Sequence, residues 1–259
     1  MRVPLHIVEA RRERLRELVR RDGFLPLADI CRHFEISEAT ARRDLAAIEA
    51  DGHITRTYGG ALADYNSSFA SLGERTKRAR SAKSRIARAA IRLVPLSGTI
   101  FIDAGTTPLA LARLLTRRKN HSITVVTNSL AVASVLGGAP GISLHLLGGI
   151  FLNRQATLFG DHAVASLTDW KIDAAFLGAE AMNAEGIWNS HEEVVRLQRA
   201  VLQKAVRSYF CIDATKLNRN TPHQVACWNE NFRLITDAPA TQLKEAGIEL
   251  SESRLLPAP

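Results

Sequence analysis

The chain has 259 residues, of which 46% are hydrophobic and 23% charged, and its formal net charge is +8. This composition excludes a disordered or fibrous protein, and the length suits one large domain plus a small one. The positive charge favours an acidic partner such as nucleic acid. No signal peptide is evident and no stretch reaches membrane-spanning length, so we expect a cytoplasmic protein with no membrane partner.

The cysteines Cys31, Cys211 and Cys227 are odd in number and far apart in the sequence. This pattern fits neither a disulfide framework nor a zinc site, so we expect buried, reduced thiols. We expect no metal and no cofactor.

Residues 7–45 predict three helices, the last two joined by a tight turn. The first covers residues 7–21, where we expect ion pairs on a solvated face, and the second covers residues 27–34. The third begins at Ser37, whose hydroxyl can cap it. Its inward positions are Ala41, Leu45 and Ile48, and its outward positions are Glu38, Thr40, Arg42 and Arg43. Such helices also occur in ordinary helical domains, but the arrangement is typical of a helix-turn-helix that reads DNA.

Residues 53–62 combine β-branched residues with paired glycines and predict a short hairpin. A hairpin after a helix-turn-helix makes a winged helix. In that fold Arg56 and Tyr58 would lie near a phosphate backbone. We therefore predict a DNA-binding domain at residues 5–62, a small and polar linker at residues 63–73, and a second domain at residues 74–259.

The second domain alternates strand and helix. The predicted strands are residues 99–103, 123–127, 143–147, 173–177, 209–212 and 233–236. The predicted helices are the later part of the basic run at 74–92 and residues 108–115, 130–136 and 192–207. This alternation predicts an α/β domain with a parallel sheet covered on both faces.

Ligands of such sheets bind at the carboxyl ends of the strands, where this chain keeps small and polar residues. At one strand end, Asp103 precedes Gly105, Thr106 and Thr107 at a predicted helix start, with Pro108 at its first position, and exposed amides there suit a phosphate. Other strand ends carry Thr127, Asn128, Ser129, Gly148, Gly149, Asp213 and Lys216. Each of these could be only a turn, but together they favour a polar pocket.

The residues Ser37, Thr40, Arg42, Arg43, Asp44 and Leu45, followed by Gly59-Gly60-Ala61, closely resemble the amino-terminal signature of the DeoR family of bacterial transcriptional regulators. The resemblance implies DNA contacts by Ser37, Thr40, Arg42 and Arg43. From the residues alone, an Arg can either bind guanine or hold a phosphate.

The second half of the chain resembles the effector domain of the same family at the strand ends named above and at Gly178-Ala179. The resemblance implies a fold like that of ribose-5-phosphate isomerase, a phosphorylated sugar or polyol as effector, and Lys83 near its phosphate. His191-Glu192-Glu193-Val194 and Thr236-Asp237-Ala238-Pro239 look most like the glycerol-3-phosphate repressor branch. Ala181 and Thr215 depart from the family pattern, which puts the shape of the effector pocket in doubt.

The alternative is a sugar-phosphate isomerase with a DNA-binding appendage. The isomerases' Asp-Gly-Ala-Asp-Glu stretch corresponds here to residues 177–181, where Leu177 replaces the first acid, and their glycine-rich lysine loop is missing. Glu180, Glu192, Asp213 and Lys216 could then bind sugar hydroxyls without chemistry or serve as surface ion pairs. In a third interpretation the second domain only oligomerises. We predict a repressor, a homodimer or tetramer on operator DNA, that is not an enzyme.

Overall fold

The computed structural model describes residues 4–22, 24–51, 54–57, 60–63, 70–119 and 121–258. Tyr58 lies outside these residues, and the side chain of Arg56 is not described either. The chain divides into two compact units with a boundary between Ala70 and Ser71, and each is described by itself.

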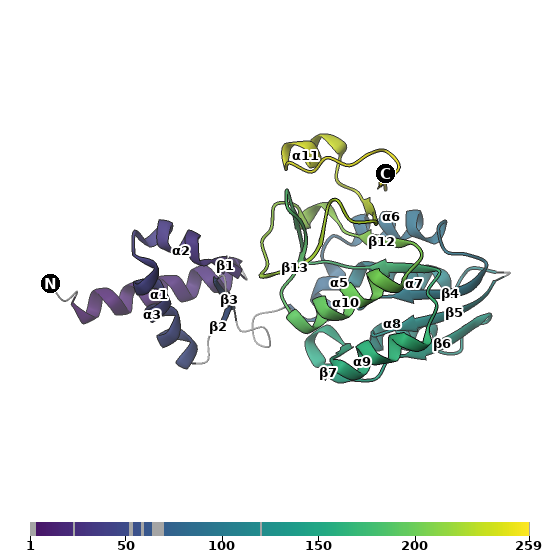
Figure 1. The fold of residues 1–259 in the computed structure, drawn as a ribbon, viewed down its shortest axis with the longest axis horizontal. Coiled ribbons are helices and arrows are strands. Elements are labelled where there is room, and N and C mark those ends of the chain that lie inside the picture. Colours follow the sequence, from purple (N-terminus) through teal and green to yellow (C-terminus); the bar gives the residue numbers. More distant parts are fainter. Residues whose placement is uncertain are drawn as a thin grey trace. The chain divides into compact units, whose positions relative to one another are not determined.

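The amino-terminal unit is a winged helix (Figure 1). Its elements in chain order are α1 (Leu5–Asp22), β1 (Phe24–Pro26), α2 (Leu27–Phe34), α3 (Glu38–Ala50), β2 (Ile54–Thr57) and β3 (Gly60–Ala63). The three strands form an antiparallel sheet in the order β1-β3-β2. The helix-turn-helix and the hairpin are confirmed. The sequence did not predict β1, because three buried residues are too few to show an alternating pattern.

The core of this unit confirms the predicted inward face of α3. Ala41 and Ile48 are fully buried and Leu45 nearly so, packed against Leu15 of α1 and Ile30 of α2. Ser37 caps the helix as predicted, since its hydroxyl accepts a hydrogen bond from the Thr40 amide at 3.3 Å. The turn before it closes with Glu35 in the left-handed region at φ 52°.

The carboxyl-terminal unit is built on seven parallel strands. The strands are β4 (Ser97–Ile102), β5 (Ser122–Thr127), β6 (Ile142–Leu146), β9 (Ala174–Leu177), β12 (Ser208–Cys211), β14 (Arg233–Thr236) and β15 (Leu255–Pro257). Their order is β15-β14-β12-β9-β4-β5-β6. The chain fills one half of the sheet from β4 outward through β6 and the other half from β9 through β15. The point where the order reverses is therefore between β4 and β9.

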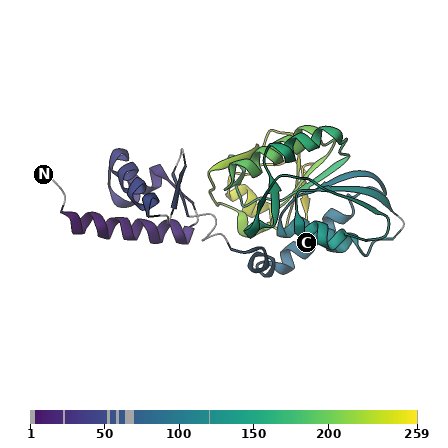
Figure 2. The same ribbon diagram turned by 90° about the horizontal axis from the view of Figure 1, so that it is seen from below.

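Helices cover both faces of this sheet, as Figure 2 shows. One face is packed by α6 (Arg80–Ile91), α7 (Thr106–Leu115) and α8 (Leu130–Leu136), and the other by α9 (Asp161–Ser166), α10 (Glu192–Lys204) and α11 (Ala240–Glu245). In β4, Phe101 faces the second layer while Ile100 and Ile102 face the first, and all three are fully buried. The predicted α/β class is confirmed.

Smaller elements lie around this sandwich. They are α5 (Leu72–Lys77), the hairpin of β7 (Ile150–Leu152) and β8 (Thr157–Phe159) with a 3-10 turn η1 (Asn153–Gln155), η2 (Leu167–Asp169), the small sheet of β10 (Ala181–Asn183), β11 (Gly186–Asn189) and β13 (His223–Cys227), and η3 (Ala214–Lys216). None of these was predicted, because each is too short to carry a periodic pattern.

The structure corrects several details of the sequence interpretation. Pro108 was expected at the first position of α7 but occupies the third. Proline still costs no hydrogen bond at the third position, because the first-turn amides of a helix have no partner within it. Helix α10 ends at Lys204, three residues early. Cys211 is buried as expected, but Cys31 and Cys227 are only half-buried. Of the proposed linker, residues 64–69 lie outside the described residues; Ala63 belongs to β3, and Ser71 caps α5.

None of the described helices has both the length and the apolar character needed to cross a membrane. The described residues also contain no cluster of His, Cys, Asp and Glu side chains that could hold a metal ion.

Candidate DNA-binding surface and effector site

The predicted DNA-reading residues lie on the outer side of α3 and at its start. Ser37, Glu38, Arg42 and Arg43 are exposed, and Thr40 is half-buried. Arg43 donates to the Ala39 carbonyl at 3.1 Å, and the hydroxyls of Ser37 and Thr40 are 3.0 Å apart. Arg42 pairs with Glu38 at 3.5 Å, with both side chains more than half exposed. Such an exposed pair is weak, so a phosphate or a base can displace it.

Asp44 is next to these arginines in the sequence but serves the fold. Its carboxylate is buried and accepts hydrogen bonds from Arg11 at 2.7 Å and Arg12 at 2.9 Å, which attach α1 to α3. Arg16 likewise contacts Asp51 at 3.0 Å. The expectation that arginines of the first helix form ion pairs holds for these three, although most of the pairing acids are in or just after α3.

In the second unit the predicted residues follow the carboxyl ends of β4, β5, β6, β9 and β12, which lie at one edge of the sheet. The reversal between β4 and β9 lies at this edge. Ligands of open parallel sheets bind at such a position. The sequence-based grouping of these residues is therefore consistent with the topology.

The Asp103 carboxylate joins the two strands at the reversal point. It is 1% exposed and accepts hydrogen bonds from the amides of Ala104 at 2.7 Å and Gly178 at 3.1 Å, and from the Gln198 side chain at 2.7 Å. Burial raises the pKa of Asp103, and these hydrogen bonds lower it in part. Asp103 thus has its acceptor capacity committed to backbone and side-chain donors, and it positions the loops on either side.

The residues after β5 are also committed to the fold. Thr127 is fully buried and donates to the Ile102 carbonyl at 2.6 Å, Asn128 bonds Ala104 at 3.0 Å and Thr157 at 3.0 Å, and Ser129 caps α8. These three side chains link β5 to the β4 loop and to the β7–β8 hairpin. We expect them to shape the site rather than to contact a ligand.

The amino terminus of α7 lies at the same edge of the sheet, directly after β4. Gly105 precedes it with extended backbone, and no side chain caps this helix end among the described residues. A Cβ at Gly105 would lie 3.2 Å from Pro108 and 3.7 Å from the Gly178 Cα, so the absent side chain permits a close approach of two loops. The amides of Thr106 and Thr107, in the first turn, form an end that suits an anion.

Two lysines, Lys83 and Lys216, lie beside Asp213 at this edge. Lys83 is buried and donates to the carbonyl oxygens of Arg75 at 2.5 Å and Arg78 at 2.7 Å, which fixes the turn between α5 and α6. Burial lowers the pKa of both lysines, and the Asp213 carboxylate opposes that shift. Asp213 itself is buried and accepts from the Thr215 amide at 3.1 Å. Lys216 is half-buried.

Glu180 follows β9 and is half-buried, with several donors around it. Ser190 donates to one carboxylate oxygen and Gln155, from the β7–β8 hairpin, donates to the other at 3.4 Å. Its charge also acts on Lys216. Glu180, Asp213 and Lys216 thus form one group of alternating charge, which suits a polyhydroxylated ligand with an anionic end.

Some predicted residues are not tied to this group. Glu192 is exposed in the first turn of α10, and Gly148 and Gly149 are exposed in the turn after β6. Gly149 has φ 130°, and a Cβ there would lie 2.3 Å from the Phe159 carbonyl oxygen, so its glycine is explained by the hairpin. Ala179 is half-buried beside Gly178.

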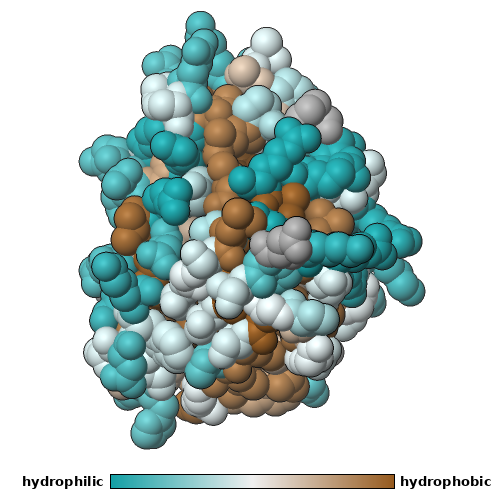
Figure 3. Space-filling model, turned by 90° about the vertical axis from the view of Figure 1, so that its right-hand side faces the viewer, coloured by the Kyte–Doolittle hydropathy of each residue, from teal (hydrophilic) through white to brown (hydrophobic). Residues whose placement is uncertain are grey.

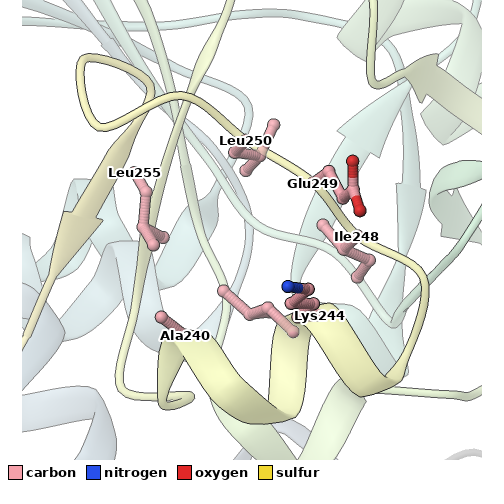
Figure 4. A pocket seen from close by; sticks show the side chains of 7 residues that line it. Ala240, Lys244, Ile248, Glu249, Leu250 and Leu255 are labelled. Atoms are coloured by element: carbon pink, nitrogen blue, oxygen red, sulfur yellow. The ribbon is translucent and has the colours of Figure 1, made fainter.

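A cavity of about 350 Å³ lies elsewhere, between α11 and the segment leading to β15 (Figure 4). Its lining is mostly apolar, and it includes Leu243, Lys244 and Glu249 but none of the predicted effector residues.

Sequence reasoning missed three polar residues of this edge, Gln198, Asn189 and Gln155, and it used Asp237 only in the family resemblance without assigning it to the site. Gln198 lies on the buried face of α10, where a polar residue at an inward position is a detectable signal. It accepts from Asn189 at 2.6 Å and donates to Asp103. Asp237 holds the next strand end, accepting from Ala214 at 2.8 Å and from Arg85 at 2.9 Å.

Comparison with known proteins agrees with this division into a DNA-reading and a ligand-binding part. Residues 11–67 match the DeoR-like helix-turn-helix domain, and residues 78–238 match the DeoR C terminal sensor domain. The chain belongs to the DeoR family. Its fold and its relatives make this DeoR-family chain a DNA-binding transcriptional regulator rather than an enzyme.

Several relatives of this DeoR-family chain are similar over nearly their whole length. The putative aga operon transcriptional repressor of Escherichia coli O157:H7 is 31% identical over 93% of this chain and 92% of its own. The lactose phosphotransferase system repressor of Lactococcus lactis subsp. lactis is 34% identical over 88% and 90%. The glycerol-3-phosphate regulon repressor of Escherichia coli (strain K12) is 30% identical over 86% and 88%.

Among solved structures, ribose 5-phosphate isomerase A from Methanocaldococcus jannaschii is similar over 53% of this chain and 54% of its own. The identity is 17% and the TM-score 0.40, so this likeness carries no argument about function.

Proposed function

We propose that this regulator represses a carbohydrate or polyol catabolic operon and leaves its operator when a phosphorylated sugar or polyol binds at the strand ends of the sensor domain. The observation that carries the proposal is the uncapped amino terminus of α7 at the reversal point of the sheet, where Asp103 and Gly178 hold the two halves together. This end suits the phosphate group. Relatives named as repressors of lactose phosphotransferase and glycerol-3-phosphate systems support the class of effector.

We infer the remaining contacts from the placement of the described residues and from the family resemblance. The amides of Thr106 and Thr107 bind the phosphate, Lys216 neutralises its charge, and Glu180 with Asp213 accepts from the hydroxyls. Lys83 acts through the α5–α6 turn that it fixes. The DNA is read by Ser37, Thr40, Arg42 and Arg43, with Glu38 released from Arg42, and Arg56 and Tyr58 lie near the phosphate backbone. A homo-oligomer, acting in the cytoplasm, presents paired reading helices to two half-sites.

The test is a thermal shift series with glycerol 3-phosphate, other phosphorylated sugars and polyols, and the unphosphorylated parent of each. A ligand that binds only the folded state raises the melting temperature as its concentration rises. We expect one phosphorylated compound to do so and its parent not to. If no compound does, the sensor half of the proposal is wrong and the domain that only oligomerises becomes the better interpretation.

Two variants separate the two halves of the proposal. Thr106→Glu places a carboxylate at the phosphate position, so it abolishes the thermal shift and leaves operator binding intact. Arg43→Ala removes a cation from α3, so it abolishes operator binding and leaves the thermal shift intact. Induction that survives Thr106→Glu contradicts the phosphate site, and normal operator affinity in Arg43→Ala contradicts the reading helix.

A further inference from the structure

One long stretch of the sensor domain contains no ionised side chain. From position 120 to position 153 the sequence contains no Asp, Glu, Lys or Arg, in a chain of which 23% is charged. This stretch supplies β5, α8, β6 and β7. Helix α8 packs against β6 and also contacts β8. The uncharged residues are therefore one continuous region in space, which we call the neutral edge.

The neutral edge exposes backbone and apolar side chains to solvent. Strand β6 pairs with β5 alone among the strands of the described residues, so its outer side is an open sheet edge. Ile150 is 64% exposed, Phe151 46%, Leu130 42% and Leu146 40%. Figure 3 faces the end of the domain where β4, β5 and β6 are labelled in Figure 1, and neutral and apolar residues, white and brown, gather in its lower half.

An open edge strand presents unpaired backbone N–H and C=O groups that can pair with another chain. Proteins that keep an edge strand in solvent usually place on it a charged residue, most often Lys, or a Pro. Without such a residue the edge can pair with a strand of another chain. Strand β6 has the sequence Ile-Ser-Leu-His-Leu and carries none of these. Exposed apolar side chains that gather at one place mark an interaction surface.

The charge of the protein identifies the partner. Nucleic acid and acidic proteins require cations, which the neutral edge lacks. Two copies of a chain with net charge +8 repel each other overall, so contact through a surface without charged residues avoids placing like charges against each other. An interface related by a two-fold axis brings the same patch of both subunits together, so an uncharged patch is compatible with its own copy.

We propose that a second copy of this chain binds the neutral edge, with β6, α8 and β7 of the two subunits in contact. This rests on the oligomer in the proposed function and names its surface. The β7–β8 hairpin also gives the contact a link to the ligand: it exposes Ile150 and Phe151, and its η1 turn places Gln155 on Glu180 at 3.4 Å. The same hairpin is held to β5 by Leu158 donating to Asn128 at 2.8 Å.

The test measures self-association of the full chain by sedimentation and light scattering over a range of protein concentrations. Ile150→Lys and Ser134→Lys place a cation on two elements of the neutral edge, β7 and α8, and Ser134 is exposed. Val206→Lys is the matched control, because Val206 is 61% exposed and lies outside the neutral edge. We expect the wild type to be oligomeric, both edge variants to associate at least about ten-fold more weakly, and the control to match the wild type.

Circular dichroism and melting temperature confirm that each variant is folded. An oligomer that is unchanged in both edge variants overturns the neutral edge as the interface while the oligomer itself stands. A wild type that is monomeric overturns this inference together with the oligomer in the proposed function. A control weakened as strongly as Ile150→Lys also overturns the inference, because added charge anywhere would then have the same effect.

Discussion

If Lys216 contacts the anionic ligand as proposed, we expect it to couple ligand binding to proton uptake. Burial lowers the pKa of Lys216 in the folded, ligand-free protein below its value in the unfolded chain. The folded state is therefore favoured most at a pH above the unfolded pKa, where Lys216 is neutral in both states. This advantage is lost as the pH falls through the folded pKa. An anionic ligand favours the charged ammonium and raises the pKa again. Between the pKa of Lys216 in the free protein and its higher pKa in the complex, binding therefore takes up a proton. We expect the affinity to fall as the pH rises from about 7 toward the ordinary lysine pKa of about 10.4.

Calorimetry of the ligand found by thermal shift, in buffers of different ionisation enthalpy, measures the number of protons taken up. Starting near pH 7 keeps the phosphate group mostly dianionic, so that its own titration does not reverse the trend. Lys216→Met removes the uptake and weakens binding, whereas Lys204→Met, at an exposed position of α10, retains both. Equal uptake in the Lys216→Met variant would contradict a contact between this ammonium and the anion.

At the residue scale the sequence located the polar residues of the proposed site. It did not show which of their hydrogen-bonding groups are already used within the fold. Asp103, Thr127, Asn128 and Ser129 were found because they follow predicted strands. The folded structure then commits their hydrogen-bonding groups to neighbouring loops, and only the three-dimensional arrangement shows this. Gln155 could not be found at all, because the hairpin that carries it has no periodic pattern and reaches Glu180 through a contact distant in sequence.

At the scale of single elements, α3 combines at Ser37 an observed helix cap with a proposed DNA contact. The Ser37 hydroxyl accepts from the Thr40 amide, so we expect Ser37→Ala to lower the free energy of unfolding by about 1 kcal/mol, as the loss of a helix cap does. Ser37→Asp keeps a capping oxygen and adds a negative charge facing the DNA phosphates. We expect this variant to retain the stability and to lose operator affinity.

Urea denaturation and operator titration of both variants separate the two roles of Ser37. If Ser37→Asp binds the operator as tightly as the wild type, Ser37 does not face the phosphate backbone. If Ser37→Ala is as stable as the wild type, the cap contributes nothing to the fold.

Elements with a clear apolar pattern were predictable from the sequence, and elements without one were not. The bounds of α2 and α8 agree with the prediction residue for residue, because their apolar positions repeat at helical spacing and are bounded by a turn or a capping Ser. The inner strands β9 and β12 appear as buried apolar runs, whereas the edge strand β15, with three residues and none of them buried, was not predicted. The arms β7–β8 and β10–β11, by contrast, are held by contacts with the sheet ends, which are not encoded within three or four residues.

At the scale of the whole molecule, the operator and the ligand must affect each other by the same factor. If the ligand weakens operator binding, the operator weakens ligand binding by the same factor, because the free energy of the doubly bound state does not depend on the order of binding. We expect the ratio of ligand Kd values with and without operator to equal the ratio of operator Kd values with and without ligand. The operator is a duplex selected by the protein from a random pool, and the ligand is the compound identified by thermal shift.

Two variants show where this coupling resides. Arg43→Ala cannot bind the operator, so in this variant an excess of the duplex leaves the ligand Kd at its value without DNA. We expect Ile150→Lys to separate the subunits and to leave the ligand site and the DNA-reading helix intact. The ratio of ligand Kd values and the ratio of operator Kd values should then both fall toward one. The ligand Kd measured without DNA should stay within about two-fold of the wild type. Coupling of full size in a monomeric Ile150→Lys variant would mean that a single subunit transmits the signal, and that the contact between copies serves only to pair the reading helices on DNA.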